Sequence, residues 1–339
     1  MIYKDLLTIL LERQDLPRDA MLAAMHALMG GEYTPAQIAG FLVAMRMKGE
    51  TVTEIAAAAE VMRELSIKVP LADVPYLVDT CGTGGDGAHT FNISTAAVFV
   101  AAACGAHVAK HGGRSVSSSS GSADVLEALG ANVSLTPEKL TEAVKTIGVG
   151  FMFAPNHHNA MKHAAPARRE LGVRTLFNML GPLTNPAGAP NQVLGVYSRD
   201  LTGKLARVLQ TLGSRHVLVV HAEEGLDEIS LASPTWVAEL KDGHVSEYEL
   251  EPGLFGLPQV PASEMVAKSK EEAVAMLLAA LENRHPAASA IVALNAGAAV
   301  YVSGRAGSLQ QGVALAQAAI QNGAARARLD AYVKLSKQG

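Results

Sequence analysis

An alternation of short apolar runs with helix-like segments, starting near residue 74, is the feature that most constrains the fold of this chain. The apolar runs cover residues 76–80, 107–110, 149–153, 192–196 and 216–221. Runs of this length separated by helical segments are typical of βαβ units. We therefore expect an α/β fold with a mainly parallel central sheet. Residues 234–265 add strand-like and turn residues, and residues 270–337 return to helices.

The first ~70 residues predict a separate group of helices. Thr34–Gln37 and Thr51–Glu54 each have the pattern of a capping box, in which two side chains satisfy the free amides of a first helical turn. Methionines recur here at 21, 25, 29, 45, 47 and 62. Such methionines are typical of core packing or of a helical subunit interface. At 339 residues and 49% hydrophobic content, the chain can bury a large core and a smaller one.

A glycine-rich segment, residues 82–87, follows the first apolar run directly. Glycine loops suit phosphate because backbone N–H groups can converge on the anion and glycine tolerates positive φ. An apolar helix-like run follows, and Ser94 or Thr95 is a plausible N-cap for it. We therefore expect the loop and a helix N-terminus to face the same anionic ligand.

The spacing of Gly82, Gly84 and Gly87 also fits a dinucleotide-binding fingerprint, but the residues around it do not. The helix starts late, and the stretch 110–114 is basic where that fingerprint wants an acidic residue. Asp86 lies inside the loop, where a carboxylate beside phosphate needs a bridging cation or substrate hydroxyls. These residues favour a phosphate-bearing substrate held with a divalent metal.

Basic and hydroxyl side chains follow the second apolar run. Lys110, His111 and Arg114 are expected in a loop at the end of a strand, where cations suit an anionic ligand of an open α/β sheet. Five of the seven residues 115–121 are serine. Consecutive hydroxyls there are interpreted as donors aimed at an anion, with a plain solvated loop as the alternative.

Paired carboxylates occur at Asp227 and Glu228, just beyond the fifth apolar run. In a loop they suit Mg²⁺, which takes one or two carboxylates, waters and substrate oxygens, although acidic runs are more often solvated surface. His157, His158 and His163 match no zinc spacing.

The remaining composition excludes several classes of protein. A net charge of −4 gives no electrostatic footprint for nucleic acid, and two cysteines make neither a disulfide framework nor a cysteine zinc site. The longest apolar run, 96–106, is shorter than the ~20 residues of a membrane helix, and the N-terminus lacks the shape of a signal peptide. We expect a soluble cytoplasmic protein. No nucleophile elbow or P-loop occurs, and no residue is assigned as general acid or base.

Several longer motifs, in this order along the chain, closely resemble anthranilate phosphoribosyltransferases. They are residues 82–86, 92–95, 110–130, 168–172, 178–186 and 227–228. The resemblance spans essentially the whole chain. It implies transfer of a 5-phosphoribosyl group from phosphoribosyl diphosphate to the amine of anthranilate in tryptophan biosynthesis, with Mg²⁺ and a homodimer formed through the helical domain.

The resemblance also implies a nucleoside phosphorylase-like phosphoribosyltransferase architecture. Its helical domain is expected over residues 1–72, joined by helices from about 166–188. The α/β domain, which would bind phosphoribosyl diphosphate, is expected over 73–165 and 189–339.

The resemblance also implies, by position, a set of site residues. Phosphoribosyl diphosphate would contact Gly82, Gly85, Asp86, Thr90, Asn92, Ile93, Ser94, Thr95, Lys110, His111, Gly112, Gly113, Arg114, Ser115, Val116, Ser117, Ser118 and Ser122. Anthranilate would contact Gly82, His111, Gly113, His158 and Arg168. The metal would contact Ser94, Asp227 and Glu228.

Two positions depart from the family pattern. Gly113 stands where an asparagine is usual, which removes a side-chain contact to the acceptor, and Asn159 stands where a proline is common. Two rival functions stay open from the sequence. A pyrimidine nucleoside phosphorylase shares the glycine-rich loop but needs no paired carboxylates, and a catalytically silent, nucleic-acid-binding relative would need a basic groove.

Overall fold

The computed structural model describes residues 2–114 and 120–338 and contains a seven-stranded sheet in the order β3-β2-β1-β4-β5-β6-β7. The strands are β1 (Leu77–Gly82), β2 (His107–Gly112), β3 (Val149–Phe153), β4 (Asn191–Gly195), β5 (His216–Ala222), β6 (Thr235–Lys241) and β7 (His244–Leu250). The first five pair in parallel, whereas β6 and β7 are antiparallel. The predicted α/β fold with a mainly parallel sheet is therefore confirmed.

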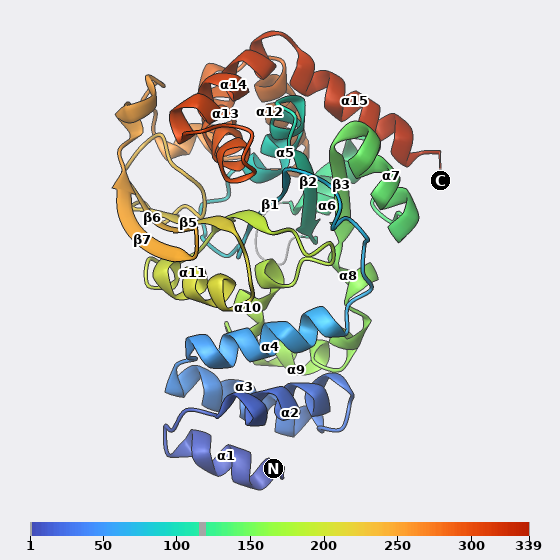
Figure 1. Cartoon of the computed structure of the whole chain (residues 1–339), viewed down its shortest axis with the longest axis vertical. Coiled ribbons are helices and arrows are strands. Elements are labelled where there is room, and N and C mark those ends of the chain that lie inside the picture. Colours follow the sequence, from blue (N-terminus) through green and yellow to red (C-terminus); the bar gives the residue numbers. More distant parts are fainter. Residues whose placement is uncertain (1, 115–119, 339) are drawn as a thin grey trace.

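Helices lie on both sides of this sheet, and more helices extend beyond one side (Figure 1). They are α1 (Tyr3–Leu11), α2 (Arg18–Met29), α3 (Pro35–Lys48), α4 (Val52–Glu64), α5 (Ile93–Ala103), α6 (Ser122–Ala128), α7 (Pro137–Ile147), α8 (Ala154–His157), α9 (Ala165–Leu171), α10 (Phe177–Leu180), α11 (Leu201–Thr211), α12 (Lys270–Leu281), α13 (Pro286–Val302), α14 (Leu309–Gln321) and α15 (Ala324–Ser336). Both predicted capping boxes are present, at Thr34 with Gln37 and at Thr51 with Glu54.

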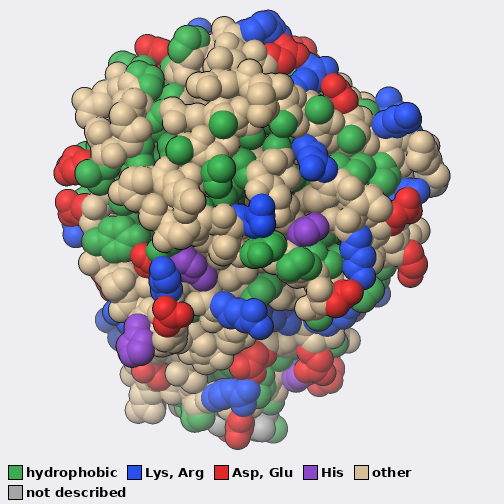
Figure 2. Space-filling view, turned by 45° about the horizontal axis from the view of Figure 1, so that its top comes forward, with side chains coloured by type: hydrophobic (Ala, Val, Ile, Leu, Met, Phe, Trp, Pro, Cys, Tyr) green, Lys and Arg blue, Asp and Glu red, His purple; other side chains and the backbone are tan. Residues whose placement is uncertain are grey.

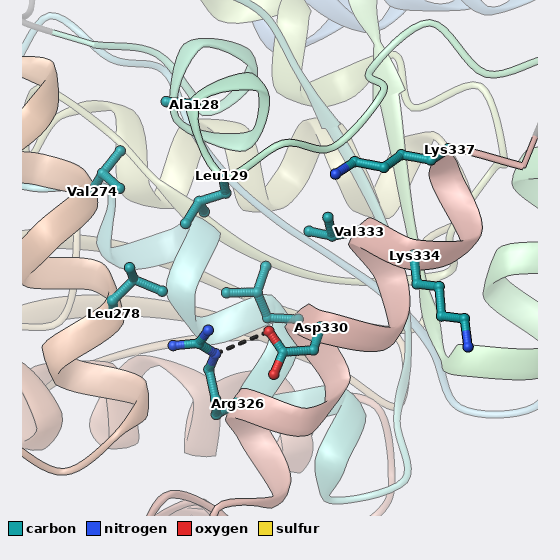
Figure 3. Close-up of a pocket in the computed structure, with 10 residues that line it drawn as sticks. Ala128, Leu129, Val274, Leu278, Arg326, Asp330, Val333, Lys334 and Lys337 are labelled. Atoms are coloured by element: carbon teal, nitrogen blue, oxygen red, sulfur yellow. Dashed lines mark hydrogen bonds and ion pairs between the residues drawn. The ribbon is translucent and has the colours of Figure 1, made fainter.

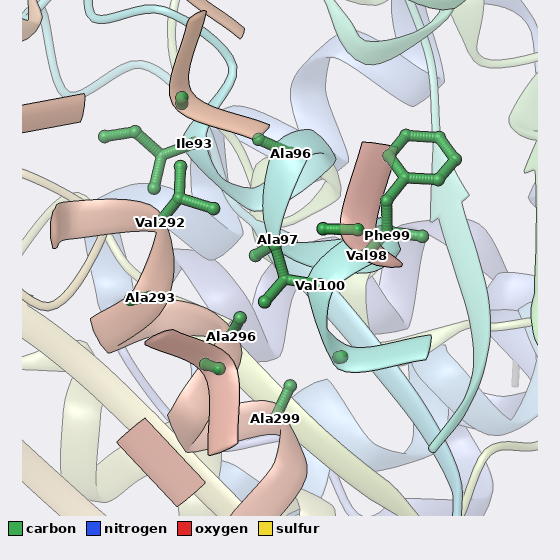
Figure 4. Packing of buried hydrophobic residues seen from close by; sticks show 14 of the residues in the cluster. Ile93, Ala96, Ala97, Val98, Phe99, Val100, Val292, Ala293, Ala296 and Ala299 are labelled. Atoms are coloured by element: carbon green, nitrogen blue, oxygen red, sulfur yellow. The ribbon is translucent and has the colours of Figure 1, made fainter. Parts of the chain in front are cut away.

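Alternate residues of the strands divide the apolar core into two layers. Leu218 and Val220 of β5 pack with α5 and α12–α15, whereas Val217 and Val219 pack with α11 and the N-terminal helices. This is the two-residue period of a strand buried on both faces. In the first layer, small side chains let α5 and α13 approach each other closely. Ala96 and Ala97 of α5 and Ala296 of α13 are examples (Figure 4).

The N-terminal helices α1–α4 do not contribute to the sheet. Helix α9 packs on α3 and α10 packs on α4, so the 165–183 segment adjoins the N-terminal helices. The division into two domains at the residues given above stays a prediction. No single helix in the described part of the chain is long and apolar enough to cross a membrane. Helices α12 and α13 reach that length and apolar content only together, and they are bent by 75° at their junction.

Two local predictions were wrong. Helix α5 begins at Ile93 with Asn92 at its N-cap position, so neither Ser94 nor Thr95 caps it. Strand β2 continues to Gly112, so Lys110 and His111 lie in the strand rather than in the loop after it. At the start of α5 a carboxylate from a distant loop, described below, replaces the expected local cap.

Candidate active site

The carboxyl ends of three parallel strands, β1, β2 and β5, bring the predicted site segments together. The glycine loop follows β1, the end of β2 carries Lys110 and His111, and the loop after β5 carries the two carboxylates. Between β1 and β4 the strand order changes direction, since β2 and β3 lie on one side of β1, and β4 and β5 on the other. Such a switch point is where open α/β sheets bind ligands.

Asp227 lies at this switch point against two paired glycines, Gly82 of β1 and Gly195 of β4. A Cβ at Gly82 would lie 2.4 Å from Asp227 Oδ2, and a Cβ at Gly195 would lie 1.6 Å from the Asp227 carbonyl oxygen. The amide of Gly84 donates to Asp227 Oδ2 at 3.0 Å. Only glycine leaves room for the acidic loop here, and Gly195 was not identified from the sequence.

Glu228 lies at the start of α5, where its Oε1 accepts from the amide of Ser94 at 3.0 Å. A carboxylate from a distant loop therefore supplies the cap that the sequence assigned to a local hydroxyl. The local side chains bind elsewhere: Thr95 Oγ1 donates to Ser122 Oγ at 2.9 Å, and Asn92 Nδ2 donates to the Ser120 carbonyl at 3.1 Å. These bonds tie the start of α5 to the start of α6.

Asp227 and Glu228 are only partly exposed, and the pKa values of both carboxyls are raised. For Asp227 the main cause is burial, followed by the charge of Asp86, whereas for Glu228 it is burial, followed by the charge of Asp227. Lys110 is the cation that opposes these effects, and its Nζ donates to Ser94 Oγ at 3.2 Å and to the Thr80 carbonyl. The site therefore concentrates negative charge that a further cation would stabilise.

The chemistry of these groups fits Mg²⁺ in its usual substrate-bridging role. In residues 2–114 and 120–338, no group of three or more His, Cys, Asp or Glu side chains could enclose a metal. Mg²⁺ does not require one, because it keeps several waters and binds one or two carboxylates together with substrate phosphates. The hydrogen bonds from the Gly84 and Ser94 amides use one oxygen of Asp227 and one of Glu228.

Of the other residues predicted to bind the donor in this region, Asp86 lies beside Asp227. Asp86 accepts from the amides of Ala88 at 3.2 Å and Asp227 at 3.4 Å. Thr90 forms an isolated antiparallel bridge with Val266. The Ile93 side chain is buried in the core, so only its backbone can reach a ligand.

The residues of the predicted basic loop lie in two environments: Lys110 and His111 are in β2, whereas Arg114 lies beyond the strand, against α6. Arg114 binds Asp124 and Glu127 of α6 and lies over the Phe153 ring, so its charge is compensated by acids. A Cβ at Gly113 would have no atom of the described residues within 4 Å, so there is room where the family pattern places asparagine. The predicted contacts Ser115, Val116, Ser117 and Ser118 lie outside the described residues.

His111 and His158 form a buried pair with ring centroids 5.0 Å apart. Burial lowers the pKa of His111 to about 3 and that of His158 to about 4, so both imidazoles are neutral near pH 7. The Nε2 atoms of both rings are buried and have no hydrogen-bond partner in the described part of the chain. Unsatisfied buried nitrogens of this kind are suited to a bound ligand.

Arg168 of α9, the predicted partner of the acceptor carboxylate, lies over the Phe177 ring at 5.1 Å. Its pKa is lowered by burial. A second arginine, Arg174, was missed by the sequence reasoning. It donates to the Gly85 carbonyl and lies over the Tyr197 ring, so it contacts the glycine loop directly.

A pocket of about 510 Å³ lies elsewhere, between α6, α12 and α15 (Figure 3). Leu129, Val274 and Leu278 form part of its apolar wall, and Arg326 is bound to Asp330 at its edge. None of the predicted site residues lines it.

Comparisons with known proteins show the family of this chain. Residues 74–326 match the a/b domain of a glycosyl transferase family, and residues 4–66 match the helical bundle domain of a glycosyl transferase family. The anthranilate phosphoribosyltransferase of Thiobacillus denitrificans is 59% identical over 98% of this chain and 97% of that protein, and that of Laribacter hongkongensis is 59% identical over 96% of each. The chain belongs to the anthranilate phosphoribosyltransferase family.

Solved structures of the anthranilate phosphoribosyltransferase family share the fold. The enzyme from Thermus thermophilus superposes with a TM-score of 0.92 at 43% identity, covering 98% of this chain and 99% of that chain. The Saccharomyces cerevisiae enzyme in complex with PRPP and Mg has a TM-score of 0.82 at 28% identity, covering 95% of this chain and 93% of that one. The family resemblance and the expected architecture are confirmed.

Proposed function

We propose that this protein transfers the 5-phosphoribosyl group of phosphoribosyl diphosphate to the amine of anthranilate, giving N-(5-phosphoribosyl)anthranilate and diphosphate in tryptophan biosynthesis. The main observation that supports this proposal is the position of Asp227 and Glu228, which accept hydrogen bonds from the glycine loop and from the start of α5. The identity of the family members supports it.

The donor half of the site would hold the diphosphate and the ribose phosphate. Backbone amides of the loop 82–87 and the start of α5 are available there, and Lys110 adds a fixed positive charge. Partial positive charge at a helix N-terminus and converging amides both favour phosphate. Ser122 and Thr95, already hydrogen-bonded to each other, add hydroxyls on the α6 side.

Asp227 and Glu228, with Ser94, would hold Mg²⁺ in this half. The Saccharomyces cerevisiae relative was solved in complex with PRPP and Mg. When bound, the ion would supply Lewis-acid stabilisation of the charge that grows on the departing diphosphate. The two carboxylates need that cation, because burial and mutual repulsion raise the cost of keeping both ionised.

The acceptor half would be formed by Gly82, His111, Gly113, His158 and Arg168. Arg168 would bind the anthranilate carboxylate, for which a guanidinium has the matching fork geometry. The neutral rings of His111 and His158 would present beside it their Nε2 atoms, which have no hydrogen-bond partner among the described residues. No general base is assigned, because an aromatic amine is already a neutral nucleophile that needs alignment. Orientation of this kind supplies about 7–11 kcal/mol of barrier reduction.

We also infer a cytoplasmic homodimer that assembles through the N-terminal helices. Exposed apolar side chains in that part of the chain, those of Ile2, Leu11 and Met47, support this inference. Nucleic-acid binding has little support. The net charge is −4, and on the face shown in Figure 2 Lys and Arg side chains are intermixed with Asp and Glu.

The proposal is tested by the loss of anthranilate fluorescence on mixing the protein with phosphoribosyl diphosphate and Mg²⁺. We expect a loss that requires the protein, the donor and the metal together, and that stops when a chelator removes the metal. Absence of turnover, together with binding of phosphoribosyl diphosphate in calorimetry, would mean that the acceptor is a different molecule. Phosphorolysis of a pyrimidine nucleoside by inorganic phosphate would replace the proposal with the phosphorylase function.

A further inference from the structure

Asn295, in the middle of α13, binds the backbone of the acidic loop directly. Its side chain is only 2% exposed. Its Oδ1 accepts from the amide of Ile229 at 2.9 Å, and its Nδ2 donates to the carbonyl of Ile229 at 2.9 Å and to that of Ile291 at 3.0 Å. The amide side chain thus satisfies both backbone groups of the residue that follows Glu228.

The loop needs such a partner at this position. Leu226 and Ile229 are buried on either side of the two carboxylates, so this stretch of backbone lies in the core, and none of the described strands pairs with it. A buried backbone N–H or C=O without a partner costs about 1–3 kcal/mol. Asn295 takes the place of a neighbouring strand, and it fixes the backbone from which Asp227 and Glu228 project.

The chemistry of the carboxamide matters as much as its position. It offers one acceptor and two donors without a charge. Aspartate at 295 would lose both donors and add a further carboxylate to a neighbourhood in which Asp86, Asp227 and Glu228 already raise one another's cost of ionisation. An apolar side chain would leave both Ile229 groups unsatisfied. Asparagine is therefore the residue type that suits this contact.

Helix α13 is also a rigid support for this contact. It packs on α14, where a Cβ at Gly297 would lie 2.6 Å from the Val313 backbone and one at Gly312 would lie 2.2 Å from the Gly297 carbonyl oxygen. On another side its alanines face α5 (Figure 4). The segment that carries Asn295 therefore has little freedom to shift.

We propose that Asn295 is a positioning residue that sets the geometry of the Asp227–Glu228 pair for the metal-bound diphosphate. It acts through the Ile229 backbone and touches neither substrate nor metal. This inference rests on the proposed function for its metal and donor, but its structural core is the attachment of the acidic loop to α13. Groups that orient metal ligands in this way typically contribute about 10–100-fold to metal affinity or activity.

The test compares Asn295→Ala with a matched control, Asn191→Ala. Asn191 is also buried and donates to a backbone carbonyl, that of Leu77, but it lies at the start of β4, away from the carboxyl ends of the strands. The first readout is hydrogen exchange of peptides covering residues 226–231 in the metal-free protein. The second is the Mg²⁺ concentration that half-saturates binding of phosphoribosyl diphosphate in calorimetry, and the same quantity in turnover.

We expect faster exchange at 226–231 and an increase of about 10–100-fold in half-saturating Mg²⁺ for Asn295→Ala. The KM for anthranilate should stay within about twofold, and Asn191→Ala should change neither readout. Unchanged exchange and unchanged Mg²⁺ dependence in folded Asn295→Ala would overturn the inference. If that variant does not fold, Asn295→Ser, which retains a small polar group, is measured against the same criteria. Exchange and donor binding do not involve the acceptor, so they decide the inference even if anthranilate proves not to be the substrate.

Discussion

Single residues decide where the acidic loop can lie. The Asp227 backbone fills the space that a Cβ at Gly195 would need. At Gly113, no atom of the described residues lies within 4 Å of such a Cβ. We expect Gly195→Ala to lower the free energy of unfolding by about 1–3 kcal/mol, because the loop must move to admit a methyl group. Activity should fall with it. Gly113→Ala is the matched control and should leave the unfolding midpoint unchanged in thermal denaturation. Equal stability of the two variants would contradict the seating of Asp227 against Gly195.

The desolvated carboxyls of Asp227 and Glu228 are expected to oppose stability while serving catalysis. Their pKa values are raised above the unfolded values, so keeping them ionised costs stability. This cost grows as the pH rises from the unfolded-state to the folded-state pKa values and is constant above them. The double variant Asp227→Asn, Glu228→Gln removes the charges. Its thermal midpoint in metal-free buffer should rise by about 1–2 °C for each kcal/mol gained, because the unfolding entropy grows with chain length. Its activity should fall and its Mg²⁺ requirement should increase. Unchanged Mg²⁺ dependence would refute the metal assignment.

At the scale of elements, one carboxylate joins the outer strands to α13. Glu239 of β6 accepts hydrogen bonds from His216 of β5, Tyr248 of β7 and Tyr301 of α13, at 2.8–2.9 Å. Burial alone would raise the pKa of Glu239, but these bonds outweigh it and lower the pKa to about 2. A depressed carboxyl pKa stabilises the fold above the unfolded value of 4.5, and this contribution is lost as the pH falls from there towards about 2.

We therefore expect Glu239→Gln to destabilise the protein by about 1.5–3 kcal/mol near neutral pH, measured by urea unfolding. The difference from the unsubstituted protein should shrink between about pH 4.5 and pH 2. Glu249→Gln, on the neighbouring strand and exposed, is the control and should show little effect at either pH. A difference that grows on acidification would show that the hydrogen bonds do not depress the pKa.

At the scale of the whole molecule, the expected dimer depends on apolar surface left on the N-terminal helices. Met47, at the end of α3, is 72% exposed. Met47→Glu should shift the protein from dimer to monomer in sedimentation velocity, because burying a new charge at an interface is costly. Leu254, 53% exposed and distant in sequence from those helices, provides the control variant Leu254→Glu, which should stay dimeric. A protein that is monomeric without substitution would contradict the inference.

The sequence by itself determined whatever depends on near neighbours in the chain. The capping boxes at Thr34 and Thr51, the strand runs and the glycine loop are local patterns, because helix caps, strand periodicity and positive φ are fixed within a few residues. Family motifs added the roles of Asp227 and Glu228 as expectations. Only the tertiary structure decided that Glu228 caps α5 and that Gly195 makes room for Asp227. It also decided that Asn295 of α13 binds the backbone of Ile229, next to Glu228. These contacts join residues up to 134 positions apart, and nothing in a local pattern encodes which distant group will satisfy a buried donor.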